Sequence, residues 1–283
     1  MSKSLIFELI KILENSKFRF SNYQDLPGFI FEKIPELKKI KYKKNQLNLD
    51  NARYSWLKGL VNSEIERVSE IGSNIGFFSF NMTNDFGVNY ESYEVNKDYS
   101  EVNKKLSRLL KLNHLLKAYT ISMNLKSLLD MKEHDLHINL NVLHHAGTAF
   151  DKDLINSQSD WFEYSKNYLG NLSKKGKYLF FQTGNMMNGS SIFDSKETIP
   201  FIRSLLMESG WKILKIGIIE DLNKLTYKSY DESEIKKIKV FNCSRNKKTN
   251  LVDYFLDGVL VSSLLTGLAQ RPLWFCKKKD AQR

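Results

Sequence analysis

The chain has 283 residues, of which 42% are hydrophobic and 27% charged, a balance typical of a globular protein with a substantial core. No stretch approaches the roughly 20 apolar residues of a membrane-spanning helix. Residues 1–18 alternate apolar and charged positions, which indicates an amphipathic helix and not a signal peptide. Cys243 and Cys276 lie far apart without a C-x-x-C partner, so we expect free thiols in a reducing cytoplasm and no structural zinc site.

The formal net charge of +11 admits a nucleic-acid partner or an anionic small substrate. The lysines are spread along the whole chain, however, and a lysine-rich composition with solvated charged faces also explains the charge. The densest basic runs are residues 38–44 and 277–279. Charge therefore does not decide between these two kinds of partner.

Residues 1–60 are predicted to form a helical extension, with helices over Leu5–Leu13 and Leu49–Leu60. After it, apolar strands alternate with helices whose apolar residues recur at helical spacing. This alternation predicts an α/β fold with a mostly parallel sheet and helices on both of its faces. The predicted strands are Val68–Glu70, Asn89–Val95, Ala118–Met123, Leu136–Leu143, Tyr178–Thr183, Trp211–Ile219 and Pro272–Cys276. One predicted helix starts at Gly76, and three others cover Asp98–Leu112, Trp161–Leu172 and Ile199–Ser209.

The pattern changes before the last predicted strand. Residues 220–249 are polar and charged, with a short strand expected at Ile238–Phe241, and a helix is expected over Leu251–Leu268. The sequence has no internal repeat and no low-complexity linker. We therefore predict one domain over residues 61–283, with an insertion at about 220–268.

The sequence RVSEIGSNIGFFSF, residues 67–80, places a turn with two glycines between the first strand and the next helix. Glycine lets the backbone turn sharply and approach a ligand without a Cβ in the way. The free N–H groups at the start of the helix favour a polar or negatively charged ligand group. The spacing is not G-x-G-x-x-G, and no G-x-x-x-x-G-K-[ST] segment occurs. The turn therefore favours a nucleoside over a pyrophosphate cofactor and excludes a P-loop.

Three segments resemble the class I, Rossmann-like S-adenosylmethionine-dependent methyltransferases. Residues 70–78 resemble motif I, residues 90–95 (YESYEV) the second strand with its acidic end, and residues 135–147 (DLHINLNVLHHAG) the fourth strand and following turn. The three segments cover about the central third of the chain in the family's order. The resemblance implies a seven-stranded sheet that ends in an antiparallel hairpin, and an N-terminal helical segment that covers the cofactor and substrate pocket.

The resemblance also implies which residues bind S-adenosylmethionine and its product S-adenosylhomocysteine. Glu94 would accept hydrogen bonds from both ribose hydroxyls, the glycine turn would cradle the methionine part, and Asn124 with Leu125 would meet the adenine. Glu70 would lie near the amino or carboxylate end of the cofactor. The expected cofactor contacts are Glu70, Gly72, Ser73, Asn74, Gly76, Phe77, Glu94, Val95, Asn124, Leu125, Asn141 and Arg53.

His144 and His145 follow the fourth predicted strand, where the methyl group must meet its acceptor. A histidine there can shape the pocket or take a proton from a hydroxyl or an amine, although both could equally be hydrogen-bonded loop residues. With His134 and His137 they invite a metal site. Adjacent histidines at a strand end are expected to point in different directions, and no compact carboxylate or cysteine set accompanies them, so no metal is expected.

Arg53 and Tyr54 lie just before the first predicted strand, where their side chains could reach the cofactor carboxylate or the substrate. Tyr54 is therefore a further candidate catalytic residue. The plainer interpretation is that Tyr54 and Trp56 pack their helix on the sheet, since aromatic side chains at such positions usually belong to a core.

The resemblance is nearest to the tRNA wobble-uridine carboxymethyltransferase branch, along residues 178–189 and 193–211, although the turn reads GSNIG where that branch has G-C-G-x-G. A compositional likeness points to methyltransferases of bacterial surface glycans. The first hypothesis is methylation, on oxygen or nitrogen, of a small polar acceptor that is sugar-like or anionic, such as a nucleotide sugar or a capsule or lipopolysaccharide precursor. RNA methylation is the second, and a cofactor-binding protein without turnover the third. The lack of a G-x-S-x-G elbow argues against a hydrolase.

Overall fold

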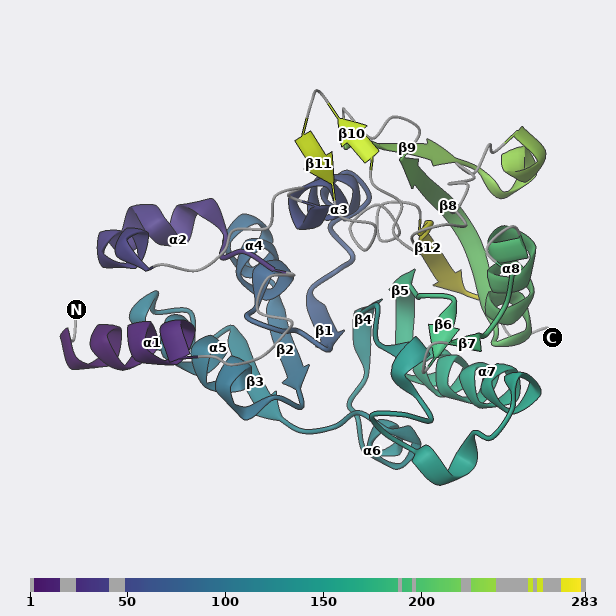
Figure 1. Ribbon diagram of the computed structural model, residues 1–283, viewed down its shortest axis with the longest axis horizontal. Helices are drawn as coiled ribbons and strands as arrows, with labels where there is room; N and C mark the ends of the chain where they lie inside the picture. Colours follow the sequence, from purple (N-terminus) through teal and green to yellow (C-terminus); the bar gives the residue numbers. More distant parts are fainter. Residues whose placement is uncertain are drawn as a thin grey trace. The chain divides into compact units, whose positions relative to one another are not determined.

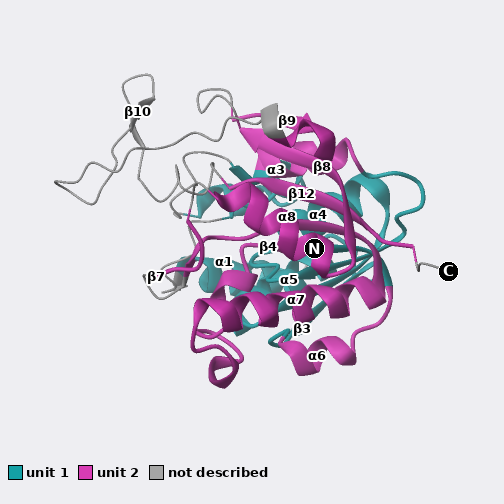
Figure 2. Ribbon diagram, turned by 90° about the vertical axis from the view of Figure 1, so that its right-hand side faces the viewer, with its two compact units in different colours: residues 1–50, 61–123, 134–138 teal, residues 51–60, 124–133, 139–283 magenta. Residues whose placement is uncertain are grey.

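The computed structural model describes residues 3–15, 24–40, 49–187, 190–194, 197–219, 225–237, 254–256, 259–261 and 271–280 (Figure 1). The chain divides into two compact units. The first contains residues 1–50, 61–123 and 134–138, and the second contains residues 51–60, 124–133 and 139–283 (Figure 2). Within the described ranges, no helix is long and apolar enough to span a membrane.

In the first unit, helices pack on parallel strands. The elements are α1 (Lys3–Asn15), α2 (Gly28–Lys33), η1 (Pro35–Lys39), β1 (Arg67–Ile71), α4 (Phe77–Phe86), β2 (Asn89–Glu94), α5 (Lys97–Leu109) and β3 (Leu116–Thr120). β1 pairs in parallel with β2, and β2 with β3. Helices α4 and α5 pack against β2 and β3, and α1 packs against α5.

The sequence of α5 shows why this helix forms and which face it buries. Asn96 precedes it, and its side-chain oxygen accepts hydrogen bonds from the N–H groups of Asp98 and Tyr99, so the first turn of the helix is capped. Val102 and Leu106, one turn apart, are fully buried. An apolar stripe at this spacing holds an amphipathic helix against the sheet.

The second unit contains the remaining elements. They are α3 (Leu49–Lys58), α6 (Leu125–Leu129), the end of β4 (His134–Leu140), η2 (Leu143–His145), η3 (Lys152–Leu154), α7 (Gln158–Lys175), β5 (Gly176–Gln182), β6 (Met186–Met187), β7 (Ser190–Ser191), α8 (Thr198–Glu208), β8 (Trp211–Ile219), β9 (Tyr227–Tyr230), η5 (Glu232–Lys237), β10 (Tyr254–Leu256), β11 (Val259–Val261) and β12 (Leu273–Lys278). Helix α7 packs on β5 and α8, and α8 packs on β8.

Eight strands form one sheet in the order β3-β2-β1-β4-β5-β12-β8-β9. β12 lies between β5 and β8 and is antiparallel to both, which confirms the predicted hairpin-like closure by the last two strands of the predicted seven. Three tryptophans of the second unit, Trp161, Trp211 and Trp274, are each at most 1% exposed. The indole N–H of Trp211 donates to the carbonyl of Leu169 at 3.0 Å, so the one polar group of this buried ring has a hydrogen-bond partner.

The structure confirms the predicted helices α1, α3, α4, α5, α7 and α8 and all seven predicted strands, within a few residues at their ends. The predicted total of seven strands is nevertheless wrong, because β9 pairs antiparallel with β8 as an eighth strand. The sequence of β9, YKSY, has exposed Lys228 and Ser229 at its centre. An edge strand of this kind lacks the apolar alternation that signals a strand.

The helix predicted over Leu251–Leu268 is wrong in the part that the structure describes. There, β10 and β11 pair antiparallel. Asp257-Gly258 lies in the sequence between these two apolar runs, and this dipeptide strongly favours a two-residue hairpin connection. The short strand predicted at Ile238–Phe241 lies outside the described residues, as does Cys243. Cys276 is a buried free thiol in β12.

Candidate cofactor and acceptor sites

The turn between β1 and α4 has three left-handed positions, at every second residue. Gly72 has φ 75°, Asn74 has φ 50° and Gly76 has φ 88°. Glycine adopts this backbone region without strain, and asparagine is among the few other residues that tolerate it. Gly76 directly precedes α4 as its N-cap residue. The structure therefore confirms the predicted order of a strand, a glycine turn and the start of a helix.

A close contact makes Gly76 necessary for packing as well as for its backbone angle. A Cβ at this position would lie 2.3 Å from Oδ1 of Asn103 and 2.8 Å from the ring of Phe80. Asn103, on α5, donates from Nδ2 to the carbonyl of Asn74 at 2.9 Å and to Oγ of Ser73 at 3.3 Å. Asn103 therefore holds the turn from the side of α5, a role that sequence spacing could not indicate.

The end of β2 holds the same turn from the other side. The carboxylate of Glu94 accepts from the N–H of Asn74 through Oε2 and from the N–H of Asn96 through Oε1, both at 2.8 Å. The carbonyl of Tyr93 accepts from the N–H groups of Gly72 and Ser73. Glu94 is buried, and this burial raises its pKa although the backbone N–H groups act in the opposite direction.

Glu70, at the end of β1, is buried, and its predicted place near the cofactor stays a prediction. Its side chain is 2% exposed, and Oε2 accepts from Oγ of Ser79 at 2.8 Å and from the hydroxyl of Tyr90 at 3.0 Å. Burial raises the pKa of Glu70 to about 8, while the two hydrogen bonds act to lower it. Glu70 thus joins α4 to β2 beneath the turn.

Two apolar side chains beside Glu94 remain open to solvent. Val95 is 68% exposed and Ile121, just after β3, is 43% exposed. The N–H of Ile121 donates to the carbonyl of Glu94 at 3.0 Å, so the two chain segments are adjacent. Val95 is among the expected cofactor contacts and Ile121 is not, because the sequence places Ile121 inside the strand predicted over Ala118–Met123.

The N-terminal extension reaches this turn within the first unit. Oε1 of Gln24 accepts a long hydrogen bond, 3.4 Å, from the N–H of Phe77 in the first turn of α4.

Arg53 and Tyr54, on α3, are both buried. Their neighbour Trp56 packs over Gly217 of β8, and its indole N–H donates to Oγ of Ser229 at 2.8 Å. The packing interpretation therefore holds for Trp56, while the roles proposed for Arg53 and Tyr54 stay predictions.

His144 and His145 lie in the short helix η2 and not at the strand end, because β4 stops at Leu140. Their ring centroids are 4.0 Å apart, so the expectation that they point in different directions is wrong: a 3₁₀ turn does not alternate its side chains as a strand does. The N–H of Gly184 donates to Nδ1 of the buried His144 at 3.3 Å. Burial, the neighbouring histidine and Arg271 lower the pKa of His144 well below its ordinary value.

Arg271, which precedes β12, is the functional candidate that the sequence did not reveal. Its Nη1 donates to Oδ1 of Asn141 at 2.7 Å, and its carbonyl accepts from Nε2 of Gln182. Asn141 in turn donates from Nδ2 to Oε1 of Gln182 at 2.9 Å. Desolvation and then the charge of Arg271 lower the pKa of His145. Helix η2, which follows β4, therefore carries two histidines of lowered pKa whose charged forms are disfavoured by the guanidinium of Arg271.

Asn124 and Leu125 start helix α6. Oδ1 of Asn124 accepts from the N–H and the hydroxyl of Ser127, and the N–H of Leu125 donates to Oδ2 of Asp151 at 3.0 Å. The hydroxyl of Tyr164 donates to the same carboxylate oxygen. These contacts define local caps, and the predicted adenine contacts of Asn124 and Leu125 stay predictions. Among the described residues, no group of three histidine, cysteine or acidic side chains could hold a metal ion.

Comparison with known proteins identifies the fold. No protein-family model matches the sequence, and no curated protein matches it either. Among solved structures, the bifunctional kinase–methyltransferase WbdD matches with a TM-score of 0.53 and 14% identity, over 95% of this chain and 46% of that one. The StiE O-methyltransferase domain matches with a TM-score of 0.51 and 13% identity, over 91% and 84% of the two chains.

The chain thus has the fold of class I methyltransferases, as the three sequence segments predicted. It spans a little under half of the WbdD chain but most of the StiE domain. Identities this low establish a common fold, and the chemistry has to be argued from the site itself.

Proposed function

We propose that the chain is an S-adenosylmethionine-dependent methyltransferase that acts on an oxygen or nitrogen of a small polar acceptor. The observation that carries the proposal is the hydrogen bond from the N–H of Asn74 to Glu94, which sets a buried carboxylate beside a glycine turn. The turn has no Cβ at Gly72, so a ligand can approach its backbone closely there. These features fit a nucleoside with a polar tail.

The residues of the first unit suggest how the cofactor would be held. Glu94 would accept hydrogen bonds from the ribose hydroxyls, which a carboxylate does better than a neutral side chain. The exposed Val95 and Ile121 would pack against the faces of the adenine, a use that explains two solvent-exposed apolar side chains next to each other. The N–H groups at the start of α4 would face the carboxylate end of the cofactor.

The cofactor supplies an electrophilic methyl group, so the protein has to orient the acceptor and exclude water. His145 is the better of the two candidate bases. His144 accepts a hydrogen bond at Nδ1 from Gly184, which fixes its tautomer and makes it a positioning residue. The lowered pKa of His145 keeps its imidazole neutral at pH 7 and able to take a proton from an acceptor hydroxyl.

The acceptor is proposed to be anionic or sugar-like, such as a nucleotide sugar or a surface-polysaccharide precursor. The guanidinium of Arg271, held by Asn141 beside the histidines, supports an acceptor with an acidic group. RNA is the alternative acceptor, favoured by the net charge of +11.

Formation of S-adenosylhomocysteine from S-adenosylmethionine tests the proposal, with nucleotide sugars and transfer RNA offered as separate acceptors. Turnover with a nucleotide sugar that falls in His145→Asn and in Arg271→Gln is the expected result. Turnover with RNA alone would favour the alternative. Cofactor binding without turnover on either class would favour a non-catalytic cofactor-binding protein.

A further inference from the structure

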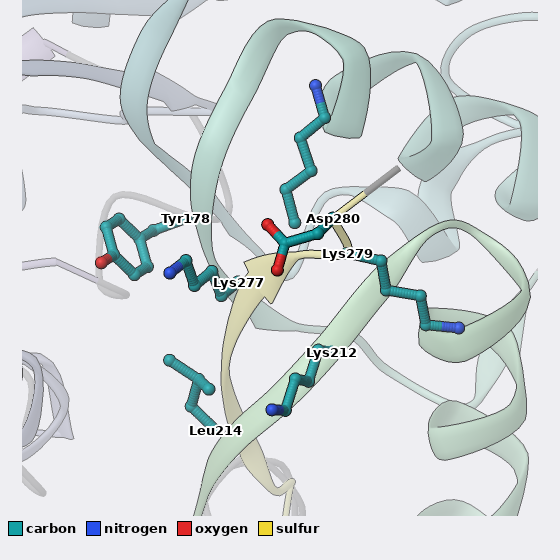
Figure 3. Close-up of a pocket in the computed structure, with 7 residues that line it drawn as sticks. Tyr178, Lys212, Leu214, Lys277, Lys279 and Asp280 are labelled. Atoms are coloured by element: carbon teal, nitrogen blue, oxygen red, sulfur yellow. The ribbon is translucent and has the colours of Figure 1, made fainter. Parts of the chain in front are cut away.

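A hollow lined mainly by lysines lies in the second unit, away from the histidines and Arg271. Its volume is about 780 Å³, which is within the range of small-molecule pockets, about 300–1,000 Å³. Tyr178 lies near the start of β5, whereas Gln182, which contacts Asn141, ends that strand. The lining residues are Tyr178, Lys212, Leu214, Lys277, Lys278, Lys279 and Asp280 (Figure 3).

The strand register places two of these lysines directly opposite each other. Lys277 of β12 pairs with Lys212 of β8 on one side and with Tyr178 of β5 on the other. Side chains directly opposite on antiparallel strands lie on the same face, with Cβ atoms about 4.5–5.5 Å apart, and like charges there are destabilising. An anion bound between the two ammonium groups would offset their repulsion, so this pair of lysines is a candidate anion-binding site.

The other charges around the hollow have different roles. Nζ of Lys279 donates to the carbonyl of Met207 at 2.6 Å and so interacts with the C-terminal turn of α8. Asp280 supplies the one carboxylate of the lining. In the part of the chain that the structure describes, no carboxylate forms an ion pair with Lys212, Lys277 or Lys278. The ammonium groups of Lys212 and Lys277, which lie on the same face of the sheet, are thus left to bind an anion with at least two negative charges.

We propose that this lysine hollow binds a small molecule that carries a diphosphate or an equivalent pair of acidic groups. Phosphate oxygens accept charge-assisted hydrogen bonds, and lysine serves them as a compact point charge. A single-stranded nucleic acid fits less well, because such sites offer aromatic faces to the bases. The ring of Tyr178 is already stacked on Phe275, with centroids 5.6 Å apart and an interplanar angle of 10°.

Calorimetric titration of the full chain with inorganic pyrophosphate at low salt tests the proposal. The wild type is expected to bind, and Lys212→Gln/Lys277→Gln to bind about tenfold more weakly or worse, since each charged hydrogen bond contributes measurably. Lys152→Gln/Lys174→Gln removes two exposed lysines from elsewhere in the same unit and is the matched control, with unchanged affinity expected. In the absence of ligand, Lys277→Gln alone should raise the melting temperature at low salt, because it removes the like-charge pair.

Three results would overturn the proposal. The wild type could fail to bind pyrophosphate, or the test and control variants could lose the same amount of pyrophosphate affinity. The third is that Lys212→Gln/Lys277→Gln loses binding to RNA or to anionic vesicles while its pyrophosphate affinity equals that of the wild type. The methyltransferase proposal is tested separately, because S-adenosylhomocysteine binding should be the same in Lys212→Gln/Lys277→Gln and in the wild type. Either proposal can therefore fail without the other.

Discussion

The carboxylate of Glu94 and the backbone N–H of Asn74 are joined by a hydrogen bond of 2.8 Å. This contact connects the end of β2 to the turn that follows β1, and it holds Asn74 at a φ of 50°. The turn is also tied to α5 through Asn103. Because β2 and α5 fix the turn from two sides, its shape does not depend on the ligand, which lowers the entropy cost of binding.

The crowding at Gly76 gives a prediction with a matched control. Gly76→Ala places a methyl group against Asn103 and Phe80 at a left-handed φ, whereas Gly87→Ala has a similar φ of 65° and no atom within 4 Å. Both should lose about 1–2 kcal/mol for the backbone conformation, and Gly76→Ala should lose about 1–3 kcal/mol more for overpacking. Urea unfolding measures the difference, and equal losses would show that the turn relaxes around the methyl group.

Glu70 predicts a pH dependence of stability. Its pKa of about 8 in the folded chain exceeds the ordinary value of about 4.3 in the unfolded chain. Between these pH values the folded chain binds more protons, so this group's stabilisation is fully present below pH 4.3 and is lost as the pH rises through 8.

Glu70→Gln imitates the protonated side chain and removes that dependence. Urea unfolding between pH 5 and 9 should therefore show the stability of Glu70→Gln rising relative to the wild type as the pH increases. Glu66→Gln, at an exposed glutamate of the same unit, is the control for the loss of one carboxyl group. A constant difference for Glu70→Gln would mean that its carboxyl is ionised when folded.

His145 and Arg271 together predict the pH profile of turnover. If neutral His145 is the base, the rate should fall on acidification through a pKa below the usual 6.5 of histidine. Arg271→Gln removes a positive charge that lowers this pKa, so the acidic limb should move to higher pH. His145→Asn should remove that limb and lower kcat by about 10²–10⁴-fold. An acidic limb that stays in place in Arg271→Gln would contradict the electrostatic coupling.

The fold and the glycine turn between β1 and α4 could be predicted because their signals are local. Strand, glycine turn and helix follow one another within residues 67–80, and Glu94 ends the next strand. Arg271 could not be predicted, because it lies 130 residues from Asn141 and no motif surrounds it. Asn103 was missed for a related reason: its importance depends on which face of α5 covers Gly76, and helical spacing shows only that the position is polar.

The edge of the sheet was the least predictable part. β9 has a polar sequence, and it forms because β8 offers it a free edge for backbone hydrogen bonds, which do not depend on side chains. A helix is predicted over Leu251–Leu268 because a short apolar run has no decisive period, whereas β10 and β11 within this range pair as strands. In both cases the pairing partner decides the structure, and the partner is not visible in the local sequence.

Calorimetric binding of S-adenosylhomocysteine to the wild type, Glu94→Ala, Gly72→Val and the control Gly87→Ala tests the central proposal most directly. The wild type and Gly87→Ala should bind, and the two site variants should lose binding while remaining folded by circular dichroism. Glu94→Ala removes the carboxylate and Gly72→Val fills a left-handed position at φ 75°. If the wild type binds neither S-adenosylhomocysteine nor S-adenosylmethionine, the methyltransferase proposal is contradicted.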